Sequence, residues 1–152
     1  MWIRIAALLA TLFLVTPAFA TGGFTCVVDD DNLQFEASSA MGRGMGSPFL
    51  NLMAHAKLKL KGTPNDLSEL DLRGKLVHSW MDHPELRLHF YAEREGEMPH
   101  GTFELVIATK ATGDEINYEG EYRLNIFYTE PPANPVEGAY LKASGTVRCD
   151  VE

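Results

Sequence analysis

Positive charge is scarce in this sequence. Its 152 residues include 13 Lys and Arg against 21 Asp and Glu, which gives a formal net charge of −8 at pH 7. Nucleic acids and anionic membrane surfaces are bound by clustered cations, so we expect neither as a partner. The apolar share of 45% is enough for a buried core, and the length suits a single domain.

Long apolar runs are missing after the first 20 residues. Those residues, MWIRIAALLATLFLVTPAFA, contain one basic residue, Arg4, followed by an apolar run over residues 5–15 and a small residue at Ala20. This order is typical of a secretory signal peptide cleaved after Ala20. The apolar run is shorter than the roughly 20 residues that a membrane-spanning helix needs. We expect residues 1–20 to be removed on export and residues 21–152 to form one domain.

Removal of this leader makes the remaining chain more acidic. The leader holds one of the 13 basic residues and no acid, so 12 basic residues face 21 acidic ones, a formal charge of −9. The short leader with a single Arg is typical of a bacterial periplasmic protein, and secretion from a eukaryotic cell is the alternative. Association with a membrane is not expected after cleavage.

Cysteine is also rare, with only Cys26 and Cys149 present. Two cysteines in an exported chain predict one disulfide, and neither belongs to the Cys-x-x-Cys pattern of a catalytic thiol pair. On the chain-entropy model, closing so long an interval stabilises the fold by about 4–5 kcal/mol. Because the bridge needs Cα atoms within about 7 Å, the first and last strands should lie side by side or face each other.

Apolar and polar residues alternate through most of the remaining chain, which is the pattern of half-buried β-strands. Residues 67–72 are the exception, and we expect a helical turn there. Tight turns between the alternating segments indicate antiparallel pairing. The sequence therefore predicts an all-β fold, a small meander of about eight antiparallel strands closed into a barrel or folded as a sandwich, with its termini joined by the disulfide. The expected strands cover residues 24–28, 33–38, 52–61, 75–81, 86–93, 103–109, 116–129 and 141–151.

Alternation alone does not say which parity faces inward. In a soluble barrel the apolar parity fills the interior, whereas in an eight-stranded outer-membrane barrel it faces lipid. The chain ends in Cys149-Asp150-Val151-Glu152, without the terminal aromatic residue typical of bacterial outer-membrane barrels. We therefore expect the apolar parity inside, with the outer-membrane barrel as an alternative.

Familiar catalytic motifs are absent from the sequence. It contains no Gly-x-Ser-x-Gly, no His-Glu-x-x-His and no Walker-type glycine loop. The glycines at 42, 44 and 46 precede Ser47-Pro48 and an expected strand, so they lack the helix N-terminus that a phosphate cradle requires. We expect neither enzymatic activity nor a cofactor.

One segment has the composition of a metal site. His78-Ser79-Trp80-Met81-Asp82-His83 places two imidazoles, a thioether and a carboxylate at the end of an expected strand. Thioether with imidazole suits Cu(I), and carboxylate with imidazole suits Zn(II) or Cu(II). The hypothesis is a copper or zinc site formed by His78, Met81 and His83. Against it, alternation points His78 and Met81 to opposite faces unless the strand has already ended.

A second candidate site lies on the longest expected strand. Tyr118, Tyr122 and Tyr128 share one parity, with Gly120 between the first two, where we also expect this long strand to bend. Such a face could line a cavity for an apolar or sugar-like ligand. The alternative is that the tyrosines form the edge of a filled core with their hydroxyls at the rim.

Together these patterns indicate an exported, non-enzymatic binding protein. Its partner is predicted to be a ligand or a basic exported protein, such as a cationic enzyme, attracted by the negative charge. A periplasmic copper- or zinc-binding protein is the first alternative, and the outer-membrane barrel is the second.

Overall fold

The computed structural model describes residues 22–42, 47–113, 116–129 and 138–152. Within these ranges the chain forms nine β-strands and a single 3-10 turn, η2 (Asn65–Leu67). The strands are β1 (Gly22–Asp29), β2 (Leu33–Met41), β3 (Phe49–Leu58), β4 (Glu69–Asp71), β5 (Leu76–Asp82), β6 (Glu85–Glu93), β7 (Gly101–Ala111), β8 (Asn117–Tyr128) and β9 (Ala139–Val151).

All nine strands belong to one antiparallel sheet with the order β4-β3-β2-β1-β9-β8-β7-β6-β5. Neighbours in the sheet are neighbours in the chain, except that β1 pairs with β9. The two edges of the sheet are therefore β4 and β5, which follow one another in the chain but belong to opposite ends of the sheet.

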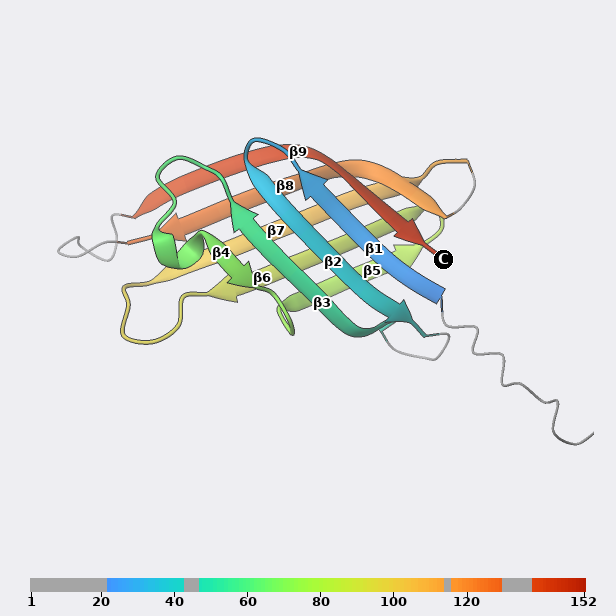
Figure 1. Ribbon diagram of the computed structural model, residues 1–152, viewed down its shortest axis with the longest axis horizontal. Coiled ribbons are helices and arrows are strands. Elements are labelled where there is room, and N and C mark those ends of the chain that lie inside the picture. Colours follow the sequence, from blue (N-terminus) through green and yellow to red (C-terminus); the bar gives the residue numbers. More distant parts are fainter. Residues whose placement is uncertain (1–21, 43–46, 114–115, 130–137) are drawn as a thin grey trace, which may run out of the picture.

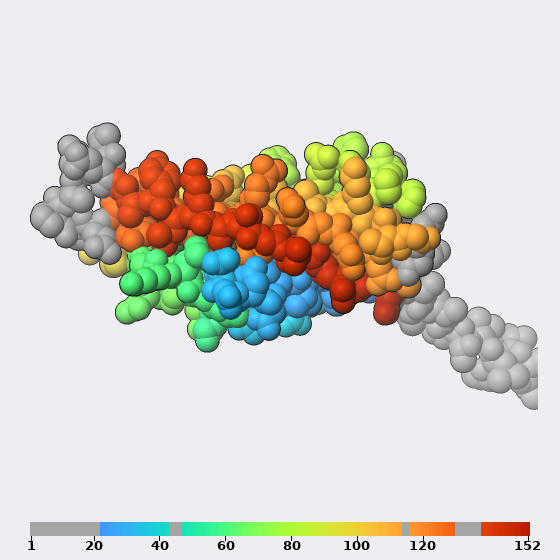
Figure 2. Space-filling view, turned by 90° about the horizontal axis from the view of Figure 1, so that it is seen from above, coloured from blue at the N-terminus to red at the C-terminus, as the bar shows by residue number. Residues whose placement is uncertain are grey.

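The sheet curls until its two halves face each other. Strands β1–β4 cross in front of β5–β8, and β9 runs along the rim between the two layers (Figures 1 and 2). The layers meet in a shared core, in which the rings of Phe35 on β2 and Phe90 on β6 lie 5.4 Å apart between centroids. The sequence prediction of a small antiparallel fold that is barrel-like or sandwich-like is confirmed.

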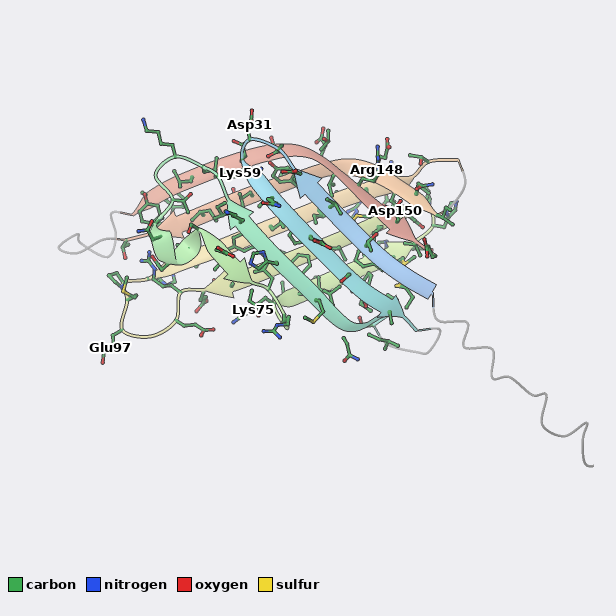
Figure 3. All side chains as sticks on the ribbon, in the orientation of Figure 1. Asp31, Lys59, Lys75, Glu97, Arg148 and Asp150 are labelled. Carbon is green, nitrogen blue, oxygen red and sulfur yellow. A yellow bond between two sulfur atoms is a disulfide. The ribbon has the colours of Figure 1, made fainter. Side chains whose placement is uncertain are left out.

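The apolar parity of each strand faces this core. On β7, every second residue from Gly101 to Thr109 is buried, and the pattern repeats along β6 and the middle of β8. Charged side chains, such as those of Lys59, Arg148 and Asp150, project from the outer surface (Figure 3). An outer-membrane barrel requires the opposite arrangement, with apolar side chains outward.

The predicted disulfide joins the two chain-end strands. Cys26 on β1 and Cys149 on β9 lie directly opposite each other in the ladder, with their Cα atoms 4.0 Å apart, and both are fully buried. The first and last strands are thus side by side, which is one of the two arrangements that the sequence predicted. Their side chains occupy the core face, in agreement with the apolar parity of both sequence segments.

The helical turn expected at residues 67–72 is wrong in position and extent. A 3-10 turn occupies Asn65–Leu67 instead, and Glu69–Asp71 form the short strand β4. The reason is that β2 pairs with only one side of β3. The backbone of β4 pairs with the other side, where Asp71 lies opposite His55. Those hydrogen bonds satisfy backbone N–H and C=O groups of β3 that would otherwise be unpaired at the edge of the sheet.

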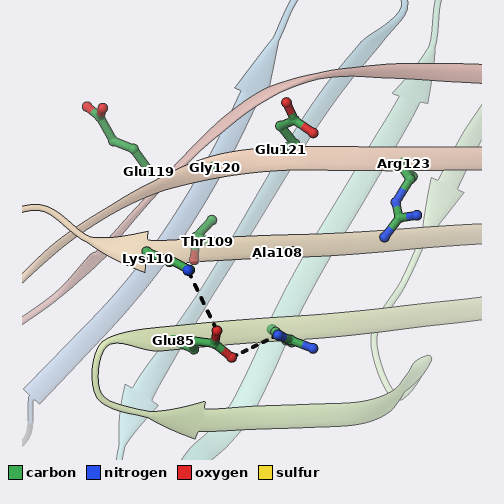
Figure 4. Close-up of a pocket in the computed structure, with 9 residues that line it drawn as sticks. Glu85, Ala108, Thr109, Lys110, Glu119, Gly120, Glu121 and Arg123 are labelled. Carbon is green, nitrogen blue, oxygen red and sulfur yellow. Dashed lines mark hydrogen bonds and ion pairs between the residues drawn. The ribbon is translucent and has the colours of Figure 1, made fainter.

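Gly120 allows β7 and β8 to approach very closely. A Cβ atom at this position would lie 2.7 Å from the Cα atom of Thr109, its partner on β7 (Figure 4). Any larger residue would push the two strands apart. Glycine is therefore required here by its small size.

Arg94 fixes η2 to the end of the other layer. Its guanidinium donates to both carboxylate oxygens of Asp66, with Nε 2.6 Å from Oδ2 and Nη2 3.2 Å from Oδ1. Nη1 also donates to the carbonyl oxygens of Pro99 at 2.8 Å and Thr129 at 3.2 Å. The side chain is only 4% exposed. One residue thus joins three segments that are distant in sequence.

The disulfide is expected to contribute strongly to stability. Replacing Cys26 and Cys149 together by alanine should lower the free energy of unfolding by about 2–5 kcal/mol, because the unfolded chain gains the freedom that the bridge removes. Urea denaturation at pH 7 measures the change. A loss below about 1 kcal/mol would show that strand pairing alone holds the chain ends together.

Arg94→Met should destabilise the fold by about 2–4 kcal/mol, since it leaves Asp66 and two carbonyl groups without their donor. The control is Arg73→Met, because Arg73 pairs with Asp71 on the exposed surface and its loss should cost much less stability than the loss of Arg94. Urea denaturation compares the two variants. Equal losses would contradict the structural role of Arg94.

Candidate functional site

The three tyrosines of β8 face the interior, as their shared parity predicted. Tyr118 and Tyr122 are buried and Tyr128 is partly buried. The Tyr122 hydroxyl donates to Asp30 Oδ2 at 2.7 Å, and the Tyr128 hydroxyl donates to the carbonyl oxygen of Gly62 at 2.8 Å. Both bonds cross from one layer to the other. The hydroxyls of these two residues therefore fasten the layers together.

Asp30 is the acceptor at the turn between β1 and β2. Its Oδ1 accepts hydrogen bonds from the backbone N–H groups of Asn32 at 2.8 Å and Leu33 at 2.9 Å. Burial alone raises the pKa of Asp30, but the hydrogen bonds from Tyr122 and the backbone outweigh burial and lower it. Burial, followed by the bond to Asp30, raises the pKa of Tyr122 well above its ordinary value, so its hydroxyl stays protonated as a donor.

Gly145 makes room for the Tyr122 ring. The two residues are opposite each other on β9 and β8, and a Cβ atom at position 145 would lie 2.8 Å from Cε1 of the ring. The small residue lets the ring lie against β9 and reach Asp30. The Tyr122 ring thus packs against β9 while its hydroxyl reaches the opposite layer.

The residues of the metal hypothesis lie in different places. His78 is exposed on the outer face of β5, Met81 packs against the core on the inner face, and His83 belongs to the turn before β6. Among the residues that the structure describes, no three His, Cys, Asp or Glu side chains are grouped so that they could hold a metal ion. The fold does not bring His78 and Met81 together.

The outer face contains a broad hollow where β8 approaches β7. It has a volume of about 550 Å³ and is lined by charged side chains of both signs, including Glu85, Lys110, Glu119 and Arg123 (Figure 4). Glu85 pairs with Arg87 at 2.8 Å and with Lys110 at 3.9 Å. Because these charges largely balance one another and lie in water, the hollow offers little net attraction to a charged ligand.

A second hollow, of about 350 Å³, lies on the outer face near the β5 edge. We call its lining residues the Trp80 patch: His78, Ser79, Trp80, Arg87, Leu88, His89 and Val106. The indole of Trp80 is 57% exposed and lies directly opposite Arg87 in the β5–β6 ladder. This is an unusual place for the largest apolar side chain, because tryptophan is highly buried on average.

Hydrogen bonds hold the floor of the Trp80 patch. His89 Nε2 lies 3.0 Å from Glu104 Oε1 on β7, and Asn125 Nδ2 on β8 donates to Glu104 Oε2 at 3.1 Å. The rings of His78 and His89 are 5.9 Å apart between centroids. Glu104 therefore anchors one imidazole, whereas Trp80 and His78 stand at the open side of the patch.

The sequence did not reveal several of these contacts. Asp30 and Gly62 lie in turns, and nothing in their local sequence marks them as acceptors for tyrosines more than 60 residues away. Trp80 belongs to the metal-like segment 78–83, which gives no sign of an exposed binding surface. The parity of Trp80, opposite to that of Met81, was the one available signal that its side chain faces outward.

Comparisons of the chain with protein-family models, with curated proteins and with solved structures find no match. None of the helical structure in the described ranges is long and apolar enough to cross a membrane.

Tyr122→Phe should lower the free energy of unfolding by about 1–3 kcal/mol at pH 7, because a partly buried carboxylate loses its hydroxyl donor. The folded pKa of Asp30 is lowered, so its stabilising effect is present above about pH 4 and is lost as pH falls through the folded pKa. The deficit of the variant should therefore shrink on acidification. Urea denaturation between pH 7 and pH 3 measures this change.

Tyr91→Phe is the matched control for Tyr122→Phe. The Tyr91 hydroxyl donates to Glu93 Oε1 at 2.8 Å, but on the exposed outer surface, so its loss should change stability by less than about 0.5 kcal/mol. If the two variants lose the same stability, or if the deficit of Tyr122→Phe does not depend on pH, the contact with Asp30 does not fasten the layers.

Proposed function

We propose that this chain is an exported, non-enzymatic binding protein that holds a protein partner on the Trp80 patch. The observation that carries the proposal is the exposure of Trp80 on the outer face, beside Arg87 and above a mostly apolar hollow. Tryptophan and arginine are the side chains most enriched among residues that dominate the energy of protein interfaces.

The shape of the hollow favours a protein over a small molecule. At about 350 Å³ it is near the lower limit of small-molecule sites, and it opens widely on the sheet surface. Such a depression suits one protruding side chain of a partner, with the indole and Arg87 packing beside it. The fixed position of His89 on Glu104 provides a preorganised floor for that contact.

The charge of the chain defines the kind of partner. Without the leader, 12 basic residues face 21 acidic ones, and this formal charge of −9 attracts a basic protein over distances beyond direct contact and speeds the encounter. The signal-like leader and the disulfide support an oxidising compartment outside the cytoplasm, the periplasm in a bacterium. The proposed partner is therefore a basic protein exported to the same compartment.

The patch lacks the arrangement expected of a hydrolytic site. His89 is engaged by Glu104, and Ser79, which also lines the hollow, lies opposite Leu88 and has no hydrogen bond to a histidine in the described part of the chain. A general base must lie within hydrogen-bonding reach of its nucleophile. The geometry thus favours binding over catalysis.

Trp80→Ala should weaken partner binding about 30-fold or more, which is the effect of losing an interface residue worth about 2 kcal/mol. The test is affinity capture of basic proteins from the extracellular or periplasmic extract of the producing cells, followed by titration of the captured protein against purified variants. Association should also slow as salt is raised, because screening weakens the long-range attraction.

Tyr140→Ala is the control for Trp80→Ala. Tyr140 is even more exposed, at 69%, but lies on β9 beside Phe127 and away from the Trp80 patch. A partner that binds both variants as it binds the unaltered chain would contradict the proposed function. So would a partner lost equally from both.

A further inference from the structure

β5 is a free edge of the sheet. It forms a ladder with β6 on one side, and no strand of the described chain pairs with its other side. Such an edge presents a row of unpaired N–H and C=O groups to any strand that can approach. The opposite edge, β4, has only three residues, whereas β5 has seven.

β5 carries few of the features that normally protect an edge. Its sequence, LVHSWMD, contains no Lys, Arg or Pro, and its irregularity is confined to a bulge between Leu76 and His78. Val77 and Trp80 are both exposed. An exposed edge of this length and composition is suited to pairing with another strand.

The regular part of β5 is complementary to itself. Residues 78–82 read His-Ser-Trp-Met-Asp, so an antiparallel copy centred on Trp80 places His78 opposite Asp82 and Trp80 opposite Trp80. Cross-strand pairs of aromatic rings stabilise antiparallel sheets, and an imidazole N–H can donate to a carboxylate that lies opposite it. We propose that β5 pairs with β5 of a second copy of this chain, with Trp80 at the twofold axis.

The charges next to β5 support this register. Within one copy, Asp82 lies opposite another acid, Glu85, and His78 lies opposite another imidazole, His89. Pairing in this register places His78 of each copy opposite Asp82 of the other copy, so that each imidazole has a carboxylate beside it. Neither forms an ion pair inside the described part of its own chain.

The overall negative charge does not oppose this contact strongly. The residues along β5 and beside it include Lys75 and Arg87 as well as Asp82 and Glu85, so the edge carries no net charge with neutral histidines. Charges farther away are screened, because the Debye length at 0.15 M salt is about 8 Å. The edge is thus a neutral strip on an acidic molecule.

Pairing of this kind extends the outer face across the axis. The two indoles lie side by side in the centre, flanked by Arg87 of each copy, and the two Trp80 patches become one surface. The dimer itself depends only on β5. It is therefore tested on the purified chain without any other protein.

The test is the dimer dissociation constant, measured by sedimentation equilibrium on the full chain. His78→Asp brings the new carboxylate of each copy opposite Asp82 of the other, twice per dimer, and should weaken the dimer about tenfold or more. The double variant His78→Asp with Asp82→His exchanges the two side chains and should restore affinity. His78 and Asp82 are exposed in one copy, so neither change disturbs the core.

A spectroscopic signal checks the register. The sequence has two tryptophans, Trp2 and Trp80; cleavage after Ala20 removes Trp2, and in the uncleaved chain Trp2→Phe does the same, so Trp80 is the one indole left in each copy. Two indoles paired at the axis should give a coupled far-UV circular dichroism signal that grows with protein concentration and disappears in His78→Asp.

Three results would overturn the proposal. A chain that remains monomeric at millimolar concentration does not pair through β5. A dimer that is unaffected by His78→Asp uses another surface. A dimer that is weakened by His78→Asp but not restored by the double variant, or that shows no coupled indole signal, does not have Trp80 at its axis. None of these results depends on whether the proposed basic partner exists.

Discussion

The pairing of β1 with β9 is the constraint on which the rest of this structure depends. Without it, the chain would form two separate meanders, one from β1 to β4 and the other from β5 to β9. The ladder between these two strands joins them into one sheet, and the Cys26–Cys149 bridge makes the connection covalent at the centre of that ladder. Contacts between chain ends are slow to form because a long loop must close first. A covalent bond at this position therefore acts where the entropic cost of ordering is greatest.

Polar contacts between the layers complement that connection. The apolar core draws the layers together but does not by itself fix their relative position, because hydrophobic attraction is not directional. Tyr122 on Asp30, Tyr128 on Gly62 and Arg94 on Asp66 supply the missing direction at three places along the interface. Each joins a turn or loop of the first layer to a strand or strand end of the second.

Much of the fold follows from alternation in the sequence. Period-two patterns identified eight strands, and the shared apolar parity of Cys26 and Cys149 located the bridge on the core face. Phe127 broke the alternation of β8 because it packs outside the core, between the rings of His100 and Tyr140. The short β4 was missed, since three residues are too few to show a period and its pairing depends on the free side of β3.

The candidate site was less predictable than the fold. Local sequence groups residues that are close along the chain, so His78, Met81 and His83 formed a plausible cluster even though the strand directs them to different places. The Trp80 patch combines residues from three strands, and its exposure results from the position of β5 at the edge of the sheet. That position is a property of the whole topology. It becomes visible only when all the pairings are known.

The strand order also has a consequence for the connectivity of the chain. The last strand, β9, is paired with the first, β1, so the order of the strands in the sheet is the chain order closed into a ring and broken between β4 and β5. At the closing point the N–H of Glu152 donates to the carbonyl oxygen of Gly23, and residues 22 and 152 are in contact. The break between β4 and β5 falls at an exposed turn containing Gly74, whose φ of +71° suits glycine. Joining residues 152 and 22 and opening the chain at that turn would leave each ladder of the sheet in place. The packing of the strands therefore does not require that the chain begin at β1.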